Sequence, residues 1–192
     1  MPNWCENNLT IYGSTDKINE LENVIIGYEG HGRDFFGYYV PVPKESQNTL
    51  GQSDLWGTKW EPDIYDWYRD DNTVTITMNT AWAPPIEFYQ QMEEIYDFEI
   101  EATYNEPGMC FVGYYGGEHF DYAAMDSEEV RGGIPKDLDE MYGISDWLVE
   151  QEEEERLETE ADEDEEDEES EESDYDYDRY NGGVEKDRKS VV

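Results

Sequence analysis

Histidine, cysteine and basic residues are all scarce in this chain. Its 192 residues include 2 histidines, 2 cysteines and 12 lysines and arginines, against 51 acidic residues. Cys5 and Cys110 cannot form a disulfide framework, so we expect both thiols to be reduced. No apolar run approaches the roughly 18–20 residues that a membrane helix requires, and the polar first residues do not resemble a signal peptide. We therefore expect a cytoplasmic protein that has no membrane partner.

Recognised catalytic motifs are also lacking. The chain has no glycine-rich phosphate loop, no His-Glu-x-x-His and no nucleophile elbow, so we expect neither a cofactor, a metal nor catalytic residues. Two weaker alternatives remain. His119 lies between carboxylates and is a possible metal ligand, and the amine of Pro2 is a possible general base. His31 falls in a glycine-rich loop. The residues favour a binding role over catalysis.

The formal net charge is −39, and it is not confined to one end of the chain. Residues 1–149 carry a net charge of −22 and residues 150–192 carry −17. A body this acidic repels phosphate backbones and anionic membrane surfaces, which argues against direct nucleic-acid binding. A protein partner with a basic surface remains compatible with the charge.

Hydrophobic periodicity predicts an α+β fold. Runs of alternating, β-branched or aromatic residues predict strands over 5–12, 35–40, 73–78, 98–104 and 109–115, with 118–125 as an extension of the sheet. Helical spacing predicts one helix that follows Ser14 and ends at Gly27, and another from about Pro85 to Tyr96. We expect residues 44–72 to form an ordered insertion, because three tryptophans are rarely all left in water.

This order of elements predicts a ferredoxin-like split-βαβ sheet with two helices on one face. We assign residues 1–125 to that domain and 126–149 to a polar linker with a short helix. Residues 150–192 are expected to form a disordered acidic tail. Within it, residues 162–169 are all acidic and offer nothing to bury.

Four motifs stand out along the chain: Met-Pro-Asn-Trp-Cys-Glu-Asn-Asn-Leu-Thr-Ile at 1–11, Trp-Gly-Thr-Lys-Trp at 56–60, Thr-Ala-Trp-Ala-Pro-Pro at 80–85 and the hairpin at 104–113. Together they resemble the YubB-type ferredoxin-like domain family of bacteriophages and conjugative plasmids. The resemblance covers residues 1–116. It implies a ferredoxin-like fold and a mobile-element origin, hence the cytoplasm of a host cell, but no particular activity.

The aromatic residues around Lys59 are the candidate site. Trp56, Lys59, Trp60 and Trp82, with Trp4 at the sheet edge, could place an ammonium beside a stacking platform for a ligand or partner. The alternative is structural, in which these indoles plug one face of the sheet.

Three functions are compatible with these features. The first is a phage or plasmid accessory protein that binds a host or viral protein with a basic surface, by electrostatic or nucleic-acid mimicry. The second is a small-ligand binder or enzyme that uses the Trp56–Trp60 region. The third is a salt-adapted acidic protein whose charge reports its environment and not a partner.

Overall fold

The computed structural model describes residues 3–31, 34–46 and 49–160, and the chain divides into two compact units. The first unit, Met1–Tyr142, contains every strand in the described part of the chain. In the second unit, Gly143–Val192, residues 144–160 are helical. Within the described ranges, no helix combines the length and the apolar character needed to cross a membrane.

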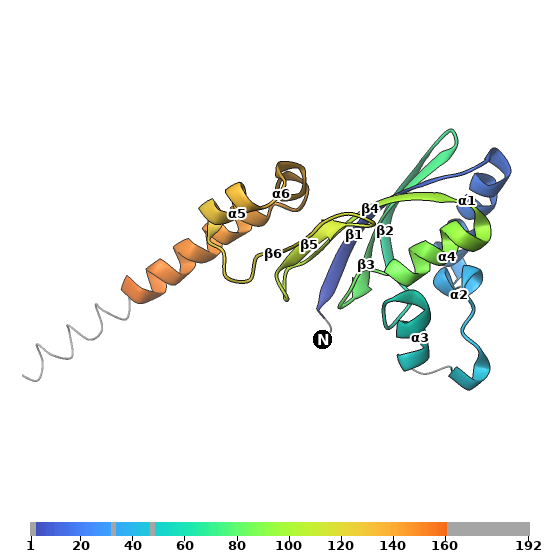
Figure 1. The fold of residues 1–192 in the computed structure, drawn as a ribbon, viewed down its shortest axis with the longest axis horizontal. Helices are drawn as coiled ribbons and strands as arrows, with labels where there is room; N and C mark the ends of the chain where they lie inside the picture. The colour runs from blue at the N-terminus through green and yellow to red at the C-terminus, as the bar shows by residue number, and fades with distance from the viewer. Residues whose placement is uncertain (1–2, 32–33, 47–48, 161–192) are drawn as a thin grey trace, which may run out of the picture. The chain divides into compact units, whose positions relative to one another are not determined.

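The first unit is built on a six-stranded antiparallel sheet (Figure 1). Along the chain its strands are β1 (Trp4–Tyr12), β2 (Asp63–Asp70), β3 (Thr73–Ala81), β4 (Glu99–Glu106), β5 (Phe111–Tyr114) and β6 (His119–Asp121). Across the sheet they run in the order β2-β3-β1-β4-β5-β6. Helix α1 (Thr15–His31) follows β1 and helix α4 (Ile86–Tyr96) joins β3 to β4. This arrangement is the ferredoxin-like split βαβ, with β5 and β6 added at one edge.

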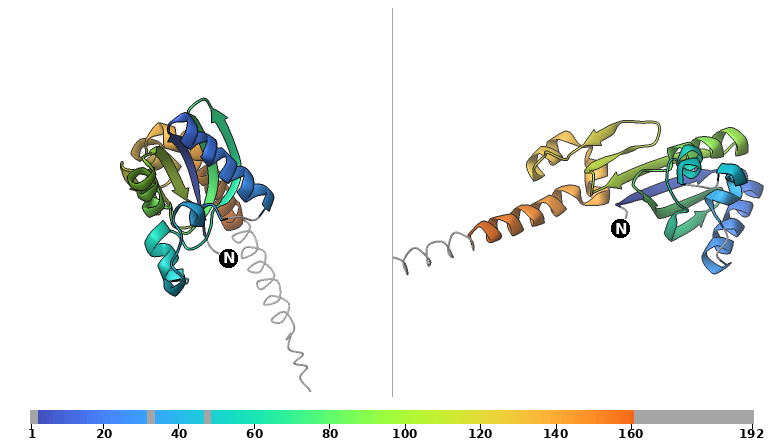
Figure 2. Two further views of the ribbon diagram at one scale, coloured as in Figure 1. Left: turned by 90° about the vertical axis from the view of Figure 1, so that its right-hand side faces the viewer. Right: turned by 90° about the horizontal axis from the view of Figure 1, so that it is seen from below.

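One face of the sheet packs against α1 and α4, which lie on the same side of it (Figures 1 and 2). Alternate residues of β1 point into this core, with Leu9 and Ile11 fully buried. Ile18 and Leu21 of α1 and Phe88 of α4 meet them in one continuous cluster. The predicted pair of helices on one face is therefore confirmed.

Helix α1 continues beyond Gly27, where the sequence predicted that it would end. A glycine inside a helix costs only about 1 kcal/mol relative to alanine. Gly27 is buried, and Ile25 of the preceding turn is fully buried in the core. Tertiary packing therefore carries the helix through a residue that sequence rules take as a stop.

The strand predicted over 35–40 is wrong, because Phe36–Tyr39 form a short helix, α2. The Glu61 carboxylate accepts hydrogen bonds from the backbone N–H groups of Phe35, Phe36 and Gly37, at 2.9, 2.7 and 2.8 Å. Phe35, Phe36 and Tyr39 all enter the core. Strand alternation would send adjacent phenylalanines to opposite faces, whereas a helical turn buries both.

The segment 44–72 was predicted to be an ordered insertion, and part of its described residues belongs to the sheet. It contains a 3-10 turn (Lys44–Ser46), helix α3 (Thr49–Trp56) and strand β2, which pairs with β3. Strand β2 escaped prediction because Asp63, Asp66 and Asp70 break its apolar pattern. An edge strand with one face in water tolerates such residues.

The segment 126–149, predicted as a polar linker with a short helix, is mostly helical. Helix α5 (Ser127–Gly133) begins with a capping box between Asp126 and Glu129, and α6 (Lys136–Tyr142) follows. Val130 and Leu138 are fully buried.

In the second unit, the disorder expected from Glu150 does not extend over residues 150–160, which are helical. Glutamate has good helix propensity, and Arg156 pairs with Glu153 and Glu160 at helical spacing, at 3.6 and 3.2 Å. The remainder of the predicted tail, residues 161–192, lies outside the described residues.

Candidate functional site

Lys59, Trp60 and Trp82 form the cluster that the sequence singled out. The Lys59 Nζ atom lies 4.8 Å from the ring centre of Trp60 and 4.7 Å from that of Trp82. The two ring centres are 6.0 Å apart with the planes tilted by 37°. Both indoles remain exposed, at 39% and 44%. An ammonium held against two indole faces is a cation–π arrangement.

The loop that carries Lys59 is attached to the end of β3. The Thr58 hydroxyl is buried and donates a hydrogen bond of 2.9 Å to the Ala81 carbonyl. Gly57 has a φ of +79°, and a Cβ there would lie 2.1 Å from a carboxylate oxygen of Glu87. Glycine is therefore required for this loop to pack against the start of α4.

Trp82 itself has an unfavourable backbone, with a φ of +68°. A left-handed conformation at a bulky residue costs on the order of 1–3 kcal/mol and persists only where its surroundings enforce it. The Trp82 N–H donates to the Asn3 carbonyl at 2.9 Å, and the Lys59 ammonium contacts the ring. These contacts hold the indole at the molecular surface.

The other two predicted site residues do not join the cluster. Trp56 is only 3% exposed, its ring packs on Phe36, and its indole N–H donates to the Val40 carbonyl at 2.8 Å. It is a core residue, as the structural alternative expected. Trp4 pairs with Ala81 in the sheet and is 43% exposed. Within the described part of the chain, no ring contact links Trp4 to Trp60 or Trp82.

The histidine and proline alternatives find little geometric support. His119 shares a hydrogen bond of 3.2 Å with the Tyr104 hydroxyl, and its ring packs on Phe111. No group of three or more histidine, cysteine or acidic side chains within reach of one ion occurs among the described residues. Pro2 and the side chain of His31 lie outside the described residues. Burial raises the pKa of the Cys5 thiol far above its usual value, which leaves it unreactive.

The second feature is the sheet face opposite α1 and α4, which we call the open face. Cross-strand register defines it, because paired residues point to the same side. One row across the sheet is Tyr68–Thr75–Thr10–Glu101. The rows on either side are Asp70–Thr73–Tyr12–Glu99 and Asp66–Thr77–Asn8–Thr103.

These rows place hydroxyls and amides in the middle of the open face and carboxylates at its sides. The floor comprises β1 and β3, where the Thr10 and Thr75 hydroxyls lie 3.2 Å apart. Asp66 and Asp70 form one side, which we call the β2 rim, and Glu99 and Glu101 form the other, the β4 rim. All four rim residues are exposed. Strands β1, β3 and β4 contain no lysine or arginine, and Arg69 of β2 lies on the other side of the sheet, where it pairs with Glu22 of α1.

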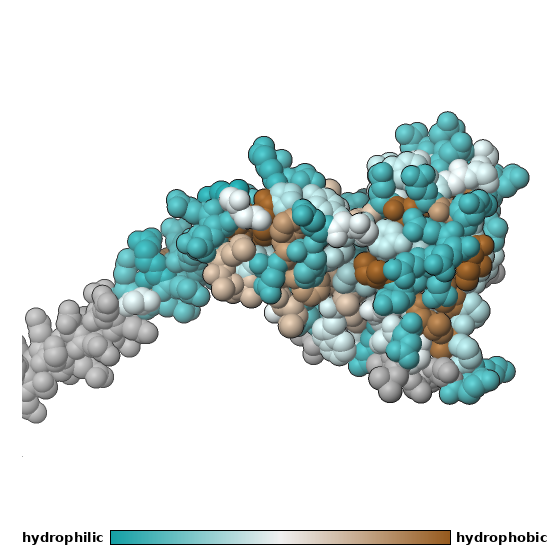
Figure 3. Space-filling model, viewed as in Figure 1, coloured by the Kyte–Doolittle hydropathy of each residue, from teal (hydrophilic) through white to brown (hydrophobic). Residues whose placement is uncertain are grey.

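Most of the described cations are already engaged with carboxylates. Ion pairs join Lys17 to Asp97, Arg69 to Glu22, Lys136 to Glu140, and Arg156 to Glu153 and Glu160. The rim carboxylates therefore add to a field with little local compensation. Hydrophilic residues also dominate the face shown in Figure 3, where hydrophobic residues form small separate patches.

A hollow lies on the open face where β4 meets α6. Its volume is about 410 Å³, and its lining includes Asn8, Thr10, Glu101, Thr103 and Met141. Thr103 shares a hydrogen bond of 2.8 Å with the Tyr142 hydroxyl, so α6 forms one wall of the hollow. Met141 is 51% exposed and supplies an apolar surface. The hollow combines polar floor groups with apolar and aromatic lining from Ile100, Ala102, Tyr114 and Tyr115 and with the flexible Met141 side chain.

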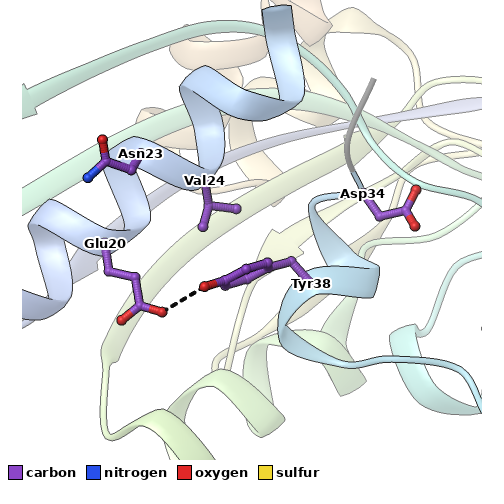
Figure 4. Close-up of a pocket in the computed structure, with 5 residues that line it drawn as sticks. All are labelled: Glu20, Asn23, Val24, Asp34 and Tyr38. Carbon is purple, nitrogen blue, oxygen red and sulfur yellow. Dashed lines mark hydrogen bonds between the residues drawn. The ribbon is translucent and has the colours of Figure 1, made fainter. Parts of the chain in front are cut away.

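A second hollow of about 410 Å³ lies between α1 and the start of α2 (Figure 4). Glu20, Asn23 and Val24 line it from α1, and Asp34 and Tyr38 line it from the other side. The Tyr38 hydroxyl donates to Glu20 at 2.9 Å, and this bond raises the pKa of Tyr38. Two carboxylates and a tyrosine do not by themselves define a ligand.

Sequence reasoning identified the indole cluster and missed the open face. Lys59 and Trp60 are neighbours in the sequence, within the five-residue motif at 56–60, and Trp82 lies in the motif at 80–85, so both motifs could be recognised from the sequence. The rims, by contrast, come from β2 and β4, which lie three strands apart in the sheet. The alternation in β4 signalled its exposed acids, but β2 was not recognised as a strand.

The comparisons with known proteins identify a family. A family model described as the ferredoxin-like domain in Api92-like protein matches residues 56–179, more than half of the chain. That range takes in β2 to β6, while β1 and α1 precede it. None of the curated proteins and none of the solved structures compared with the chain matches it. The chain therefore belongs to the family of ferredoxin-like domains found in Api92-like proteins.

Proposed function

We propose that this protein is a phage or plasmid accessory protein, of the YubB type, that binds a host or viral protein in the cytoplasm of the host cell. The partner presents a basic surface, and the open face receives it. The mobile-element origin rests on the motif resemblance at 1–11, 56–60, 80–85 and 104–113. The binding role rests on the charge and geometry of the open face.

The observation that carries the proposal is that the open face presents two rims of carboxylates and no basic residue of the four strands β1 to β4. The β2 rim and the β4 rim bring carboxylates together from strands distant in sequence, and Arg69, the one basic residue of these strands, is turned to the opposite side. Complementary potentials raise association rates and select partners more than they add affinity. A surface of this kind favours a lysine- or arginine-rich partner and repels nucleic acid.

The same surface suits nucleic-acid mimicry, in which carboxylates take the place of phosphates in a basic groove of the partner. Salt adaptation alone would distribute acidic residues over the whole surface. It would give no reason for one face of the sheet to lack lysine and arginine. A ligand-binding role for Lys59, Trp60 and Trp82 is a second candidate, favoured by the exposure of both indoles and by the strained backbone of Trp82.

The test is affinity capture from a bacterial host lysate on the immobilised full-length protein. We expect specific proteins with basic surfaces to be retained at about 0.05 M salt and released near 0.5 M, because screening shortens the range of the attraction. Two full-length variants locate the site. One carries Asp66→Asn, Asp70→Asn, Glu99→Gln and Glu101→Gln, and the other replaces the acids of 162–169 by their amides.

Loss of capture by the first variant alone supports the open face. Loss by the second alone moves the site to the acidic block at 162–169. Retention of the same proteins by an unrelated protein of equal net charge would contradict the proposal, since the binding would then be unspecific.

A further inference from the structure

We infer that the open face accepts a basic amphipathic α-helix of the partner, laid along β1 between the β2 rim and the β4 rim. This inference rests on the proposed function, because it names the class of partner that the same face receives. The rims, the floor and the hollow beside α6 each bear on it.

The distance between the rims matches a helix. Neighbouring strands lie about 4.7–4.9 Å apart, so β2 and β4, which are separated by β3 and β1, lie about 14 Å apart. An α-helix with its side chains is about 10–12 Å wide. A helix on the floor would therefore have a carboxylate rim within reach of long basic side chains on each side.

The spacing along each rim also matches. Glu99 and Glu101 are two residues apart on a strand, a separation of about 6.8 Å. Basic side chains at positions i and i+4 of a helix are about 6 Å apart along its axis. One flank of the helix can thus place successive lysines or arginines against successive carboxylates. Asp66 and Asp70, four residues apart on β2, span about twice that distance and match positions i and i+8 or i+9.

The floor accepts the middle of such a helix. Thr10, Thr75 and Thr77 present hydroxyls and methyl groups over the centre of β1 and β3. The one carboxylate of these two strands on this face, Glu6, lies toward the start of β1, where it adds to the negative charge that a basic helix would meet. The hollow of about 410 Å³ beside Met141 has room for one bulky side chain. We therefore expect the bound helix to carry an apolar anchor between its two basic flanks.

Other occupants fit less well. Nucleic acid is repelled by both rims. An extended peptide that adds to the edge of the sheet would pair with β2 by backbone bonds and would not need Glu99 or Glu101. The basic residues Lys186, Arg188 and Lys189 of this chain are few and follow a strongly acidic stretch, so they compete poorly for the face.

The experiment measures binding of two labelled synthetic peptides to the full-length protein by fluorescence anisotropy. The first is an amphipathic peptide of about 18 residues, long enough to span β1, with lysine and arginine on both flanks of a leucine and tryptophan stripe. The second has the same composition in a scrambled order that gives no amphipathic face. Circular dichroism follows the helix content of each peptide on binding.

Three double variants of the full-length protein locate the site. Asp66→Asn/Asp70→Asn removes the β2 rim and Glu99→Gln/Glu101→Gln removes the β4 rim. The matched control is Asp54→Asn/Glu94→Gln, which makes the same change in net charge at exposed residues of α3 and α4. Thermal unfolding confirms that each variant is folded.

We expect the amphipathic peptide to gain helix on binding and to bind about tenfold more tightly than the scrambled one. Each rim variant should weaken its binding about five- to tenfold, and the control less than about twofold. Equal binding of both peptides, or equal losses in rim and control variants, would overturn the helix inference and leave the proposed function standing. Loss on removal of the β4 rim alone would also overturn it. Failure of both peptides together with failure of capture from lysate would remove the proposed function as well.

Discussion

The Lys59 ammonium lies 4.7 Å from the ring centre of Trp82, although the two residues belong to different segments of the chain. Lys59 follows α3, and Trp82 follows the last residue of β3. The contact therefore joins the loop at 57–60 to the end of a sheet strand. It also holds an indole whose backbone φ is +68°.

Removing the charge of Lys59 should destabilise this junction. Lys59→Met keeps an unbranched side chain of similar length but has no cation for the two indole faces. We expect the free energy of unfolding to fall by about 0.5–1 kcal/mol, the usual size of a solvent-accessible cation–π contact. Urea unfolding followed by tryptophan fluorescence measures it. Lys44→Met, at an exposed position, is the control, and an equal effect of both changes would show that the indole contact contributes nothing.

Replacing Glu61 should unfold α2 and loosen the core beneath it. The Glu61 carboxylate accepts from three successive backbone N–H groups, at 2.7–2.9 Å. Burial raises the pKa of Glu61, and the three bonds oppose that rise. Glu61→Gln puts an amide donor where an acceptor is needed, so we expect a loss of about 1–3 kcal/mol.

Urea unfolding compares Glu61→Gln with Asp63→Asn, an exposed acid two residues away. The comparison controls for the change in charge, because both variants lose one carboxylate. A loss in Glu61→Gln no larger than in Asp63→Asn would mean that α2 does not depend on this cap.

The buried tyrosines should make the protein sensitive to alkali. Burial, followed by the Glu61 carboxylate, raises the pKa of Tyr28 to about 12, and burial also raises the pKa of Tyr39. The folded state thus retains protons that an unfolded chain releases near pH 10. Their stabilising contribution is complete below pH ~10 and is lost as the pH rises through the folded-state pKa values.

We therefore expect the urea midpoint to fall as the pH rises from about 10 to about 12. Absorbance at 295 nm should show some tyrosines that ionise only as the protein unfolds. Tyr28→Phe should reduce the slope of stability against pH in that range. A native titration curve that coincides with the curve in denaturant would contradict the prediction.

Local sequence signals predicted secondary structure correctly where the pattern of buried residues follows the hydrophobic periodicity. The β-branched run of β3 and the alternation of β4 predicted both strands, and the proline before α4 marked its start. They failed at 35–40, where aromatic residues typical of a strand form a helix. There the deciding partner is Glu61, more than twenty residues away, and no local pattern contains it.

The candidate site divides in the same way. Lys59 and Trp60 are consecutive in the chain, and Trp82 lies in a recognisable motif, so the sequence singled out all three. The burial of Trp56, three residues before Lys59, could not be predicted from the sequence, because it depends on contacts with Phe36 and with the Val40 carbonyl. Trp56 and Trp60 are equivalent in the local sequence pattern, and only the tertiary contacts bury the first and leave the second exposed.

The sequence by itself determined the class of the fold, the excess of acid and the absence of known catalytic motifs, since each follows from composition and short-range periodicity. Only the tertiary structure decided that Asp66, Asp70, Glu99 and Glu101 face the same side. Strand register across four strands sets that arrangement, and register depends on backbone pairing between segments far apart in the chain. The same strand pairing places Arg69 on the side of Glu22, so that carboxylate, hydroxyl and amide groups occupy the open face.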